Sequence, residues 1–262
     1  MRSKEAFGNH LRQLRKARGM SQQALAEEVG VSYRHVNFLE NSRAMPSRET
    51  VSKVASVLEL SLKYTNALLR AAGFSASHPM TSLDDDAMKF AKAALSRILQ
   101  QQNPYPGVAM TPIGNLVMAN EAVFKLFGLI VPIDTLGSIT NIYEFFLTDE
   151  RIKKVLVNWD QLAPKLLELV RQEVFEIDAL DETRALLERL EKTTGLKDRK
   201  QETLGHNDLP LFTLQFELDE VRLSFFSTYT TFGTPHDVAL QELRIECFYP
   251  ADEFTEEFCQ KL

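Results

Sequence analysis

Residues 20–47 read MSQQALAEEVGVSYRHVNFLENSRAMPS and contain the clearest structural pattern of the sequence. Ser21 and Ser32 each stand just before an apolar periodic segment, where a serine side chain caps a helix N-terminus. Gly30 lies between the two segments and can adopt the left-handed backbone that ends a helix. The predicted helices cover residues 22–29 and 33–40. Two short helices joined by so tight a turn predict a helix-turn-helix.

The chain on both sides of this motif also has the periodicity of helices. Phe7, Leu11 and Leu14 form one apolar stripe on a helix that ends near Gly19. A fourth helix is predicted to open at Pro46 and Ser47 and to bury Val51, Val54, Ala55 and Leu58. A fifth is predicted from about Leu62 to Ala72, before Gly73. Residues 1–72 are therefore expected to form an all-α domain of five helices.

Residues 20–47 resemble the helix-turn-helix of phage repressors and xenobiotic-response-element regulators, the XRE family. The resemblance covers some 60 residues and includes the Gln after the cap, the Leu-Ala pair, Gly-Val-Ser at the turn and the closing Leu-Glu-Asn. It implies that the helix over 33–40 enters the major groove of double-stranded DNA, with Tyr33, Arg34 and Asn37 at the base edges. The predicted DNA-contacting residues are Gln22, Ser32, Tyr33, Arg34, Asn37, Asn41 and Arg43.

The roles within this set differ by chemistry. The planar guanidinium of Arg34 can donate two hydrogen bonds to guanine, although a phosphate contact is the alternative. Gln22, Asn41 and Arg43 are interpreted as contacts to the DNA backbone that fix register. Phe38 either packs on a thymine methyl or belongs to the core, and the core interpretation is favoured. Glu40 is expected to pair with a basic side chain inside the domain, because phosphates would repel it.

The charge distribution supports a DNA-binding N-terminal part. The whole chain of 262 residues has a formal net charge of −6. Residues 1–70 hold 12 Lys and Arg against 6 Asp and Glu, a charge of +6, whereas the remainder holds 18 against 30, a charge of −12. A basic domain can meet phosphates while an acidic body is repelled from the duplex.

Residues 73–103 have the composition of a linker followed by a connecting helix. The segment GFSASHPMTSLDDD is rich in Ser, Pro and Gly, and its three aspartates, residues 84–86, suit a helix N-terminus. The helix that follows carries Met88, Ala91, Leu95 and Ile98 at helical spacing. This apolar seam either packs on the C-terminal domain or pairs two subunits, and intramolecular packing is the favoured interpretation.

Residues 104–262 predict an α+β domain with an antiparallel sheet. Strand patterns at Tyr105–Met110 and after the Pro-Ile-Gly-Asn turn are followed by a helix over about 120–127 and by further helices over 141–174 and 181–192. Three strands follow, with turns at Asp219-Glu220 and over 233–237. Their alternating apolar residues are Phe212, Leu214, Phe216 and Leu218, then Val221, Leu223 and Phe225, then Leu243, Ile245, Cys247 and Tyr249. This order is that of a PAS-like fold.

Two segments of this domain, NIYEFFLTDERIKKVLVNWDQLA and FFSTYTTFGTPHDVALQELRIECFYPAD, resemble the MmyB-like regulator ligand-binding domain. The resemblance spans most of residues 100–258 and implies a PAS-like sensor for a hydrophobic ligand, with fatty acids the leading candidates. The predicted pocket residues are Phe145, Phe146, Trp159, Phe225 and Tyr229. For each of them a place in an ordinary sheet core is the equal alternative, and Asp237, Glu242 and Arg244 are expected to make structural polar contacts.

Other classes of protein are disfavoured by the sequence. The N-terminus has no signal-peptide core and no segment has the length of a membrane span, so a cytoplasmic protein is expected. Cys247 and Cys259 lack metal-site spacing, and Cys247 is expected to be buried packing. Neither a P-loop nor GxGxxG, HExxH or GxSxG occurs, and the sequence predicts no catalytic residue, no metal and no enzyme activity.

The functional prediction is a sequence-specific transcription regulator, a homodimer on an inverted-repeat operator, controlled by a fatty-acid-like molecule and needing no other cofactor. Two alternatives stay open. One is a sensor that holds haem or flavin. The other is a regulator whose C-terminal domain only dimerises or docks a protein partner, without a small-molecule ligand.

Overall fold

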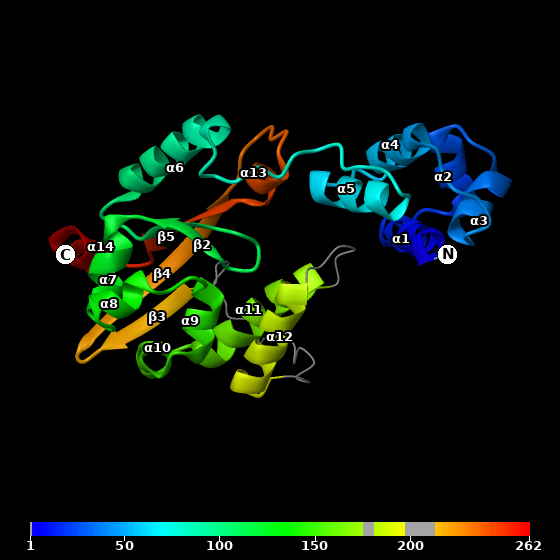
Figure 1. Cartoon of the computed structure of the whole chain (residues 1–262). Helices are drawn as coiled ribbons and strands as arrows, with labels where there is room; N and C mark the ends of the chain where they lie inside the picture. Colours follow the sequence, from blue (N-terminus) through cyan, green and yellow to red (C-terminus); the bar gives the residue numbers. More distant parts are fainter. Residues whose placement is uncertain (1, 175–180, 197–212) are drawn as a thin grey trace. The chain divides into compact units, whose positions relative to one another are not determined.

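The computed structural model describes residues 2–174, 181–196 and 213–262 (Figure 1). The chain packs as two compact units. The first comprises the chain up to Thr81 together with Thr234–Gln241, and the second comprises the described residues of 82–233 and 242–262. The chain therefore passes between the units after Thr81, after Gly233 and after Gln241.

The first unit is built from five α-helices, as the sequence predicts. They are α1 (Arg2–Ala17), α2 (Gln22–Val29), α3 (Tyr33–Glu40), α4 (Arg48–Val57) and α5 (Leu62–Ala71). Helices α2 to α5 each begin with a serine whose hydroxyl accepts a hydrogen bond from the third backbone N–H of the helix. Gly30 ends α2 with φ +76°, the left-handed conformation expected of it. The predicted bounds of α2 and α3 are confirmed.

The core of this unit gathers the apolar stripes of all five helices. Its buried residues include Phe7, Leu11, Leu25, Val36, Leu39, Val51, Leu58 and Leu68. Helix α1 approaches the end of α3 most closely at Gly8. A Cβ atom at that position would lie 2.7 Å from the carbonyl oxygen of Leu39 and 2.8 Å from that of Glu40. Only glycine allows the two backbones to come so near.

This close approach predicts that Gly8→Ala destabilises the first unit. Because the added methyl meets backbone oxygens, α1 and α3 must move apart, at a cost of about 1–3 kcal/mol typical of overpacking. Amide hydrogen exchange in α1 and α3 of the full chain measures the loss. The control is Gly137→Ala, at a helical glycine of the second unit, where a Cβ meets nothing within 4 Å and the backbone has no positive φ, so protection of α1 and α3 should not change. Equal protection in Gly8→Ala and the unaltered chain would contradict the expected contact.

The second unit is organised around one five-stranded antiparallel sheet. Its strands are β1 (Gly107–Met110), β2 (Leu116–Ala119), β3 (Thr213–Leu218), β4 (Val221–Thr230) and β5 (Arg244–Pro250). Their spatial order is β2-β1-β5-β4-β3, so that β1, the first strand, lies beside β5, the last. The predicted three-strand meander is confirmed, and the order gives the expected PAS-like sheet. Phe212, predicted on the first of these strands, lies outside the described residues.

Helices flank this sheet. They are the 3₁₀ helix η1 (Asp86–Met88), α6 (Lys89–Gln102), α7 (Glu121–Gly128), α8 (Ile133–Gly137), α9 (Ile142–Thr148), α10 (Glu150–Val155), α11 (Trp159–Val174), α12 (Asp181–Thr194) and α14 (Glu253–Lys261). Asp85 caps η1, as expected of the aspartate run. Helices α8 and α14 were not predicted. A further unpredicted helix, α13 (Val238–Glu242), lies between the predicted turn over 233–237 and the last strand.

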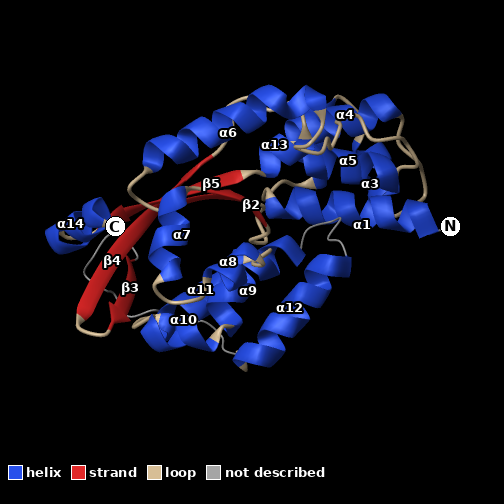
Figure 2. Ribbon diagram, turned by 60° about the vertical axis from the view of Figure 1, so that its left-hand side comes forward, coloured by secondary structure: helices blue, strands red, loops and turns tan. Residues whose placement is uncertain are grey.

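The two faces of the sheet carry separate cores. Helix α6 runs along one face and helices α7 to α11 cover the other (Figure 2). Leu95 and Leu99 of α6 pack with Ala109, Ile245 and Cys247 of the sheet. The apolar seam of this helix therefore packs within the unit, which is the interpretation that the sequence favoured. Cys247 is buried in the same core, as expected. No helix in the described part of the chain is long and apolar enough to cross a membrane.

Candidate DNA-binding and ligand-binding sites

Helix α3 presents a polar and aromatic edge to solvent. Tyr33 is 50% exposed, Arg34 is exposed and Asn37 is half-buried. Val36 and Leu39, on the opposite side of the helix, are fully packed into the core. The helical period thus separates the residues that anchor α3 from those that were predicted to reach base edges. The base-reading roles themselves stay predictions.

The buried side chain under this edge is Glu40. Arg15 donates to it through Nε at 2.5 Å and through Nη2 at 3.0 Å, and Gln22 donates to its Oε2 at 2.7 Å. Burial by itself would raise the pKa of Glu40, but the hydrogen bonds from Arg15 and Gln22 and the charges of Arg15 and Arg12 outweigh it, so the pKa is lowered. The expectation that Glu40 pairs with a basic side chain inside the domain is confirmed.

The partner that the sequence analysis missed is Arg15. It is only 8% exposed. Its guanidinium also donates to the carbonyl oxygen of Met20, at 2.6 Å. The signal in the sequence was weak, because a basic residue directly after Leu14 of an apolar stripe looks like an ordinary surface charge. Arg15 lies four residues after Leu11, so it shares the buried side of α1.

Hydrogen bonds within the domain hold several of the residues that were predicted to contact the DNA backbone near α3. Asn37 donates to Oε1 of Gln22 at 3.3 Å, which fixes the start of α2 against the middle of α3. Asn41 donates to the carbonyl oxygen of Asn37 at 2.8 Å and accepts from Arg12 at 2.9 Å. The Ser32 hydroxyl caps α3 by accepting from the backbone N–H of His35, and the Arg43 side chain is exposed. The structure therefore gathers all seven predicted residues around α3.

Phe38 does not belong to the core of the first unit, contrary to the interpretation that the sequence favoured. It is half-buried, and its ring lies 5.1 Å from the guanidinium carbon of Arg34, one helical turn earlier. Residues four apart share a side of a helix, so Phe38 follows Arg34 along the exposed side and not Val36 or Leu39. The Arg34 guanidinium therefore lies over the face of this ring.

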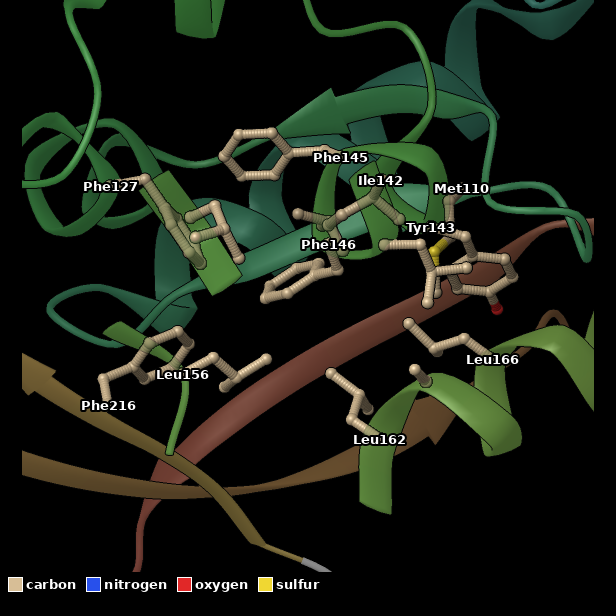
Figure 3. Close-up of a cluster of buried hydrophobic side chains, with 14 of the residues drawn as sticks. Met110, Phe127, Ile142, Tyr143, Phe145, Phe146, Leu156, Leu162, Leu166 and Phe216 are labelled. Atoms are coloured by element: carbon tan, nitrogen blue, oxygen red, sulfur yellow. The ribbon is translucent and has the colours of Figure 1, made fainter. Parts of the chain in front are cut away.

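The helix-covered face of the sheet in the second unit holds an aromatic cluster. Phe127, Phe145, Phe146, Phe216 and Phe225 meet with ring centroids 5.7–6.5 Å apart, mostly edge to face. Figure 3 shows Phe127, Phe145 and Phe146 near one another, while Tyr143 lies on the other side beside Met110 and Leu166. Three of the five predicted pocket residues, Phe145, Phe146 and Phe225, belong to this core.

Two small apolar cavities adjoin the cluster. One of about 30 Å³ is lined by Phe145 and Phe146 together with residues of α7 and α8, and one of about 10 Å³ is lined by Phe225 and Phe216. Ligand pockets for drug-sized molecules have volumes of about 300–1,000 Å³. In the described part of the chain these cavities admit a water-sized group, so an acyl chain would require the aromatic cluster to open.

Trp159 and Tyr229, the other two predicted pocket residues, line neither of these cavities. The indole Nε1 of Trp159 donates to the carbonyl oxygen of Phe146 at 3.0 Å, and Lys153 lies over its ring at 5.3 Å. Tyr229 lies near the end of β4 and is 50% exposed. Arg244 pairs with Glu173 of α11 at 3.3 Å, and Asp237 accepts hydrogen bonds from the backbone of Thr81 and Ala239. The expectation of structural polar contacts is confirmed for these two residues.

A capped helix-turn-helix with an exposed edge on its second helix, followed by a helix-covered antiparallel sheet, defines a class of DNA-binding regulators that carry a sensor domain. Residues 11–64 match the helix-turn-helix family, and residues 91–262 match the family described as "MmyB-like transcription regulator ligand binding domain". The second match covers more than half of the chain. The chain belongs to this family, and it is a DNA-binding helix-turn-helix transcription regulator with an MmyB-like ligand-binding domain.

Solved structures show likeness over shorter lengths. A helix-turn-helix transcriptional regulator of the HTH_3 family from Vibrio cholerae is 36% identical over 26% of this chain and 36% of its own, with a TM-score of 0.23. The clp gene regulator ClgR from Corynebacterium glutamicum is 27% identical over 39% of this chain and 95% of its own, with a TM-score of 0.24. This chain thus spans about a third of the Vibrio protein. No curated protein matches the chain.

Proposed function

We propose that the chain reads a specific DNA sequence with α3 and that a hydrophobic small molecule bound in the PAS-like domain controls this binding. The observation that carries the first part is the exposed edge of Tyr33, Arg34 and Asn37. Beneath this edge, Arg15 and Gln22 hold the only carboxylate of α3, Glu40, in the interior, so no free negative charge on α3 opposes phosphates. A helix with this distribution suits entry into the major groove.

Arg34 is proposed as the main base-reading residue. The Phe38 ring lies under its guanidinium and restrains the side chain, and the planar group can donate two parallel hydrogen bonds to the N7 and O6 acceptors of guanine. Gln22, Ser32, Asn41 and Arg43 lie around the ends of α2 and α3, where they would contact the DNA backbone and fix the register.

The ligand part of the proposal rests on the composition of the sheet face. The cluster around Phe146 and Phe216 offers aromatic and aliphatic surface, and the two small cavities beside it are lined by apolar residues. A molecule with a long hydrocarbon part, such as a fatty acid, matches this surface. Because the present cavities are small, binding would select or induce a more open arrangement of the cluster.

Transmission to DNA is proposed to use the connection between β4 and β5. Residues 234–241 of this connection belong to the DNA-binding unit. There the Val238 N–H donates to the carbonyl oxygen of Pro79 at 2.9 Å, and the Leu62 N–H, at the start of α5, donates to Oε1 of Gln241 at 2.6 Å. Movement of the strand ends would therefore act on α5 through the chain itself. In a dimer on an inverted repeat the two recognition helices lie about 34 Å apart. A movement of α5 that alters this spacing would change the affinity for DNA.

Replacing Arg34 with alanine tests the reading helix. We expect affinity for the preferred duplex, selected from random DNA by the unaltered protein, to fall by a factor equivalent to about 1–3 kcal/mol, and discrimination at one guanine to be lost. Arg34→Lys should keep the charge but not the two-bond geometry, so it should lose base preference more than overall affinity. The control is Arg97→Ala, an exposed arginine of α6.

Retention of both affinity and base preference in Arg34→Ala would overturn the assignment of α3 as the reading helix. A loss of affinity that is uniform across sequences, and that Arg34→Lys restores, would instead assign Arg34 to a phosphate.

The ligand is tested by mass spectrometry of an organic extract of the purified, denatured protein, with an unrelated protein from the same host as control. We expect a fatty acid or related lipid in stoichiometric amount. An extract that matches the control would argue against a tightly bound native lipid.

A second candidate for the C-terminal domain is docking of a protein partner or dimerisation without a ligand. Exposed apolar side chains favour it: Phe124 of α7, Leu129 after it and Ile133 of α8 are 39%, 54% and 69% exposed. Such a surface predicts that Ile133→Glu changes the mass in solution, whereas the ligand-sensing function predicts an unchanged mass and a ligand-dependent melting temperature.

A further inference from the structure

The helix-covered face of the sheet changes character along β4 and β5. Leu223 and Phe225 of β4 are buried in the apolar core, but Ser227 and Tyr229 follow them on the same face. In β5, Phe248 belongs to the same core, whereas Glu246 and Arg244 precede it. The strand register places Tyr229 opposite Glu246 and Ser227 opposite Phe248. One end of this face is therefore apolar and the other is polar.

Glu246 is buried in this polar end. It lies between Val108 of β1, its register partner on one side, and Tyr229 on the other. Burial raises the pKa of Glu246, and the Ser227 and Tyr229 hydroxyls lower it by a smaller amount. Arg244, two residues away, pairs with Glu173 of α11. The nearest basic residue on the strand is thus already engaged.

Tyr143 of α9 completes the cluster from the helical layer. Its ring packs on the backbone of Gly114, where a Cβ would lie 2.6 Å from the ring. The residue is 2% exposed, its hydroxyl faces that of Tyr229, and no acceptor for its own proton lies within hydrogen-bond distance among the described residues. Burial raises the pKa of Tyr143 to about 12, and Glu246 raises it further than the other charges near it do. The side chain is therefore a neutral hydrogen-bond donor held in a fixed position without an acceptor.

A buried donor without a partner is costly in a folded protein, because it has lost its hydrogen bonds to water. At a binding site such a group gains its partner when the ligand arrives. The polar residues have apolar neighbours in the sheet: Val108 of β1 lies opposite Glu246, and Phe248 of β5 lies opposite Ser227. A molecule with a hydrocarbon chain along the aromatic cluster would bring its polar end to Tyr143.

We propose that Tyr143, Tyr229 and Glu246 bind the polar end of the ligand, and that this end is an uncharged oxygen-bearing group such as an alcohol, an ester or a protonated carboxylic acid. The Tyr143 hydroxyl donates to the ligand oxygen. An ionised carboxylate is disfavoured, because the buried Glu246 is a carboxyl group itself and Arg244 is paired with Glu173. This inference rests on the proposed function and specifies the chemistry of its ligand.

The test titrates the delipidated full chain with 1-dodecanol and with dodecanoate at pH 8 and follows the fluorescence of Trp159, the only tryptophan. We expect dodecanol to bind at least about tenfold more tightly than ionised dodecanoate. Tyr143→Phe keeps the ring packing and removes the donor, so it should weaken dodecanol binding about tenfold. The control is Tyr249→Phe, on the opposite face of β5.

Glu246→Gln provides a second, independent variant. It replaces the buried carboxyl group, which would oppose a second carboxylate, with an amide, and it should bring dodecanoate affinity to within about threefold of that of dodecanol. Equal dodecanol affinity in Tyr143→Phe and the unaltered chain, or a preference of the unaltered chain for dodecanoate, would overturn the head-group assignment while leaving the proposed hydrophobic ligand in place. If neither probe binds the unaltered chain, the proposed ligand-sensing function fails and this inference fails with it.

Discussion

Glu40→Ala is expected to destabilise the DNA-binding unit by about 3–5 kcal/mol, the cost of removing one partner of a buried ion pair. The truncation leaves Arg15 charged and 8% exposed, with only the carbonyl oxygen of Met20 and no carboxylate to accept from its guanidinium. It also removes the acceptor of Gln22. Because α1, α2 and α3 meet at this carboxylate, DNA binding should be lost together with stability.

Amide hydrogen exchange of α1 to α5 in the full chain measures this effect, while the fluorescence of Trp159 reports on the second unit as an internal reference. The control is the double variant Arg15→Met, Glu40→Met, which removes both charges and should recover most of the lost stability. Protection in Glu40→Ala equal to that of the unaltered chain would show that the ion pair does not hold the unit together.

The same carboxylate gives the unit a pH dependence with a defined sign. The pKa of Glu40 is lower in the folded unit than its ordinary value. Its contribution to stability is therefore fully present above the ordinary glutamate pKa and is lost as the pH falls through the folded pKa. Acid unfolding of α1 to α5 should begin at a higher pH in the unaltered chain than in the double methionine variant, which has no carboxylate to protonate at this position.

Asn120→Ala is expected to destabilise the second unit by about 3 kcal/mol or more. The buried amide uses both its donor and its acceptor atoms: Nδ2 donates to the carbonyl oxygens of Leu99 and Tyr105, and Oδ1 accepts from the N–H groups of Gly107 and Val123. One side chain thus joins the end of α6, the start of β1 and the first turn of α7. Alanine leaves four backbone groups without this partner.

Thermal unfolding of the full chain, followed by Trp159 fluorescence, measures the loss. Asn120→Asp is the informative control, since an aspartate accepts from Gly107 and Val123 but cannot donate to Leu99 and Tyr105, and it should fall between the alanine variant and the unaltered chain. If Asn120→Ala unfolds at the same temperature as the unaltered chain, the hydrogen bonds of this amide do not stabilise the second unit.

Local signals made the first unit predictable. Ser21 and Ser32 as caps and Gly30 as a terminator depend on neighbouring residues alone, and they placed the ends of α2 and α3 correctly. The Asp219-Glu220 turn and the alternation of β4 worked for the same reason, as Asp219 adopts the positive φ of +54° that a tight hairpin needs. These features follow from the chemistry of a few consecutive residues.

Features that depend on contacts distant in sequence were not predictable in the same way. The burial of Arg15 depends on Glu40, 25 residues later, and the joint at Asn120 depends on backbone atoms 13 to 21 residues earlier. The apolar residues of β3 and β5 show similar alternation, yet Phe216 faces the aromatic cluster and Ile245 faces α6. The alternation of apolar residues shows that a strand has two different faces. Only the pairing of the strands in the sheet shows which helices cover each face.

Ligand binding in the PAS-like domain is proposed to change affinity for DNA. The most direct test measures the Kd of the delipidated chain for its selected duplex with and without saturating 1-dodecanol, at fixed salt. We expect the Kd for DNA to change by about 5- to 150-fold, in either direction, and dodecanol affinity to change by the same factor when the duplex is present. Saturated binding of dodecanol with the same Kd for DNA in both conditions would contradict it.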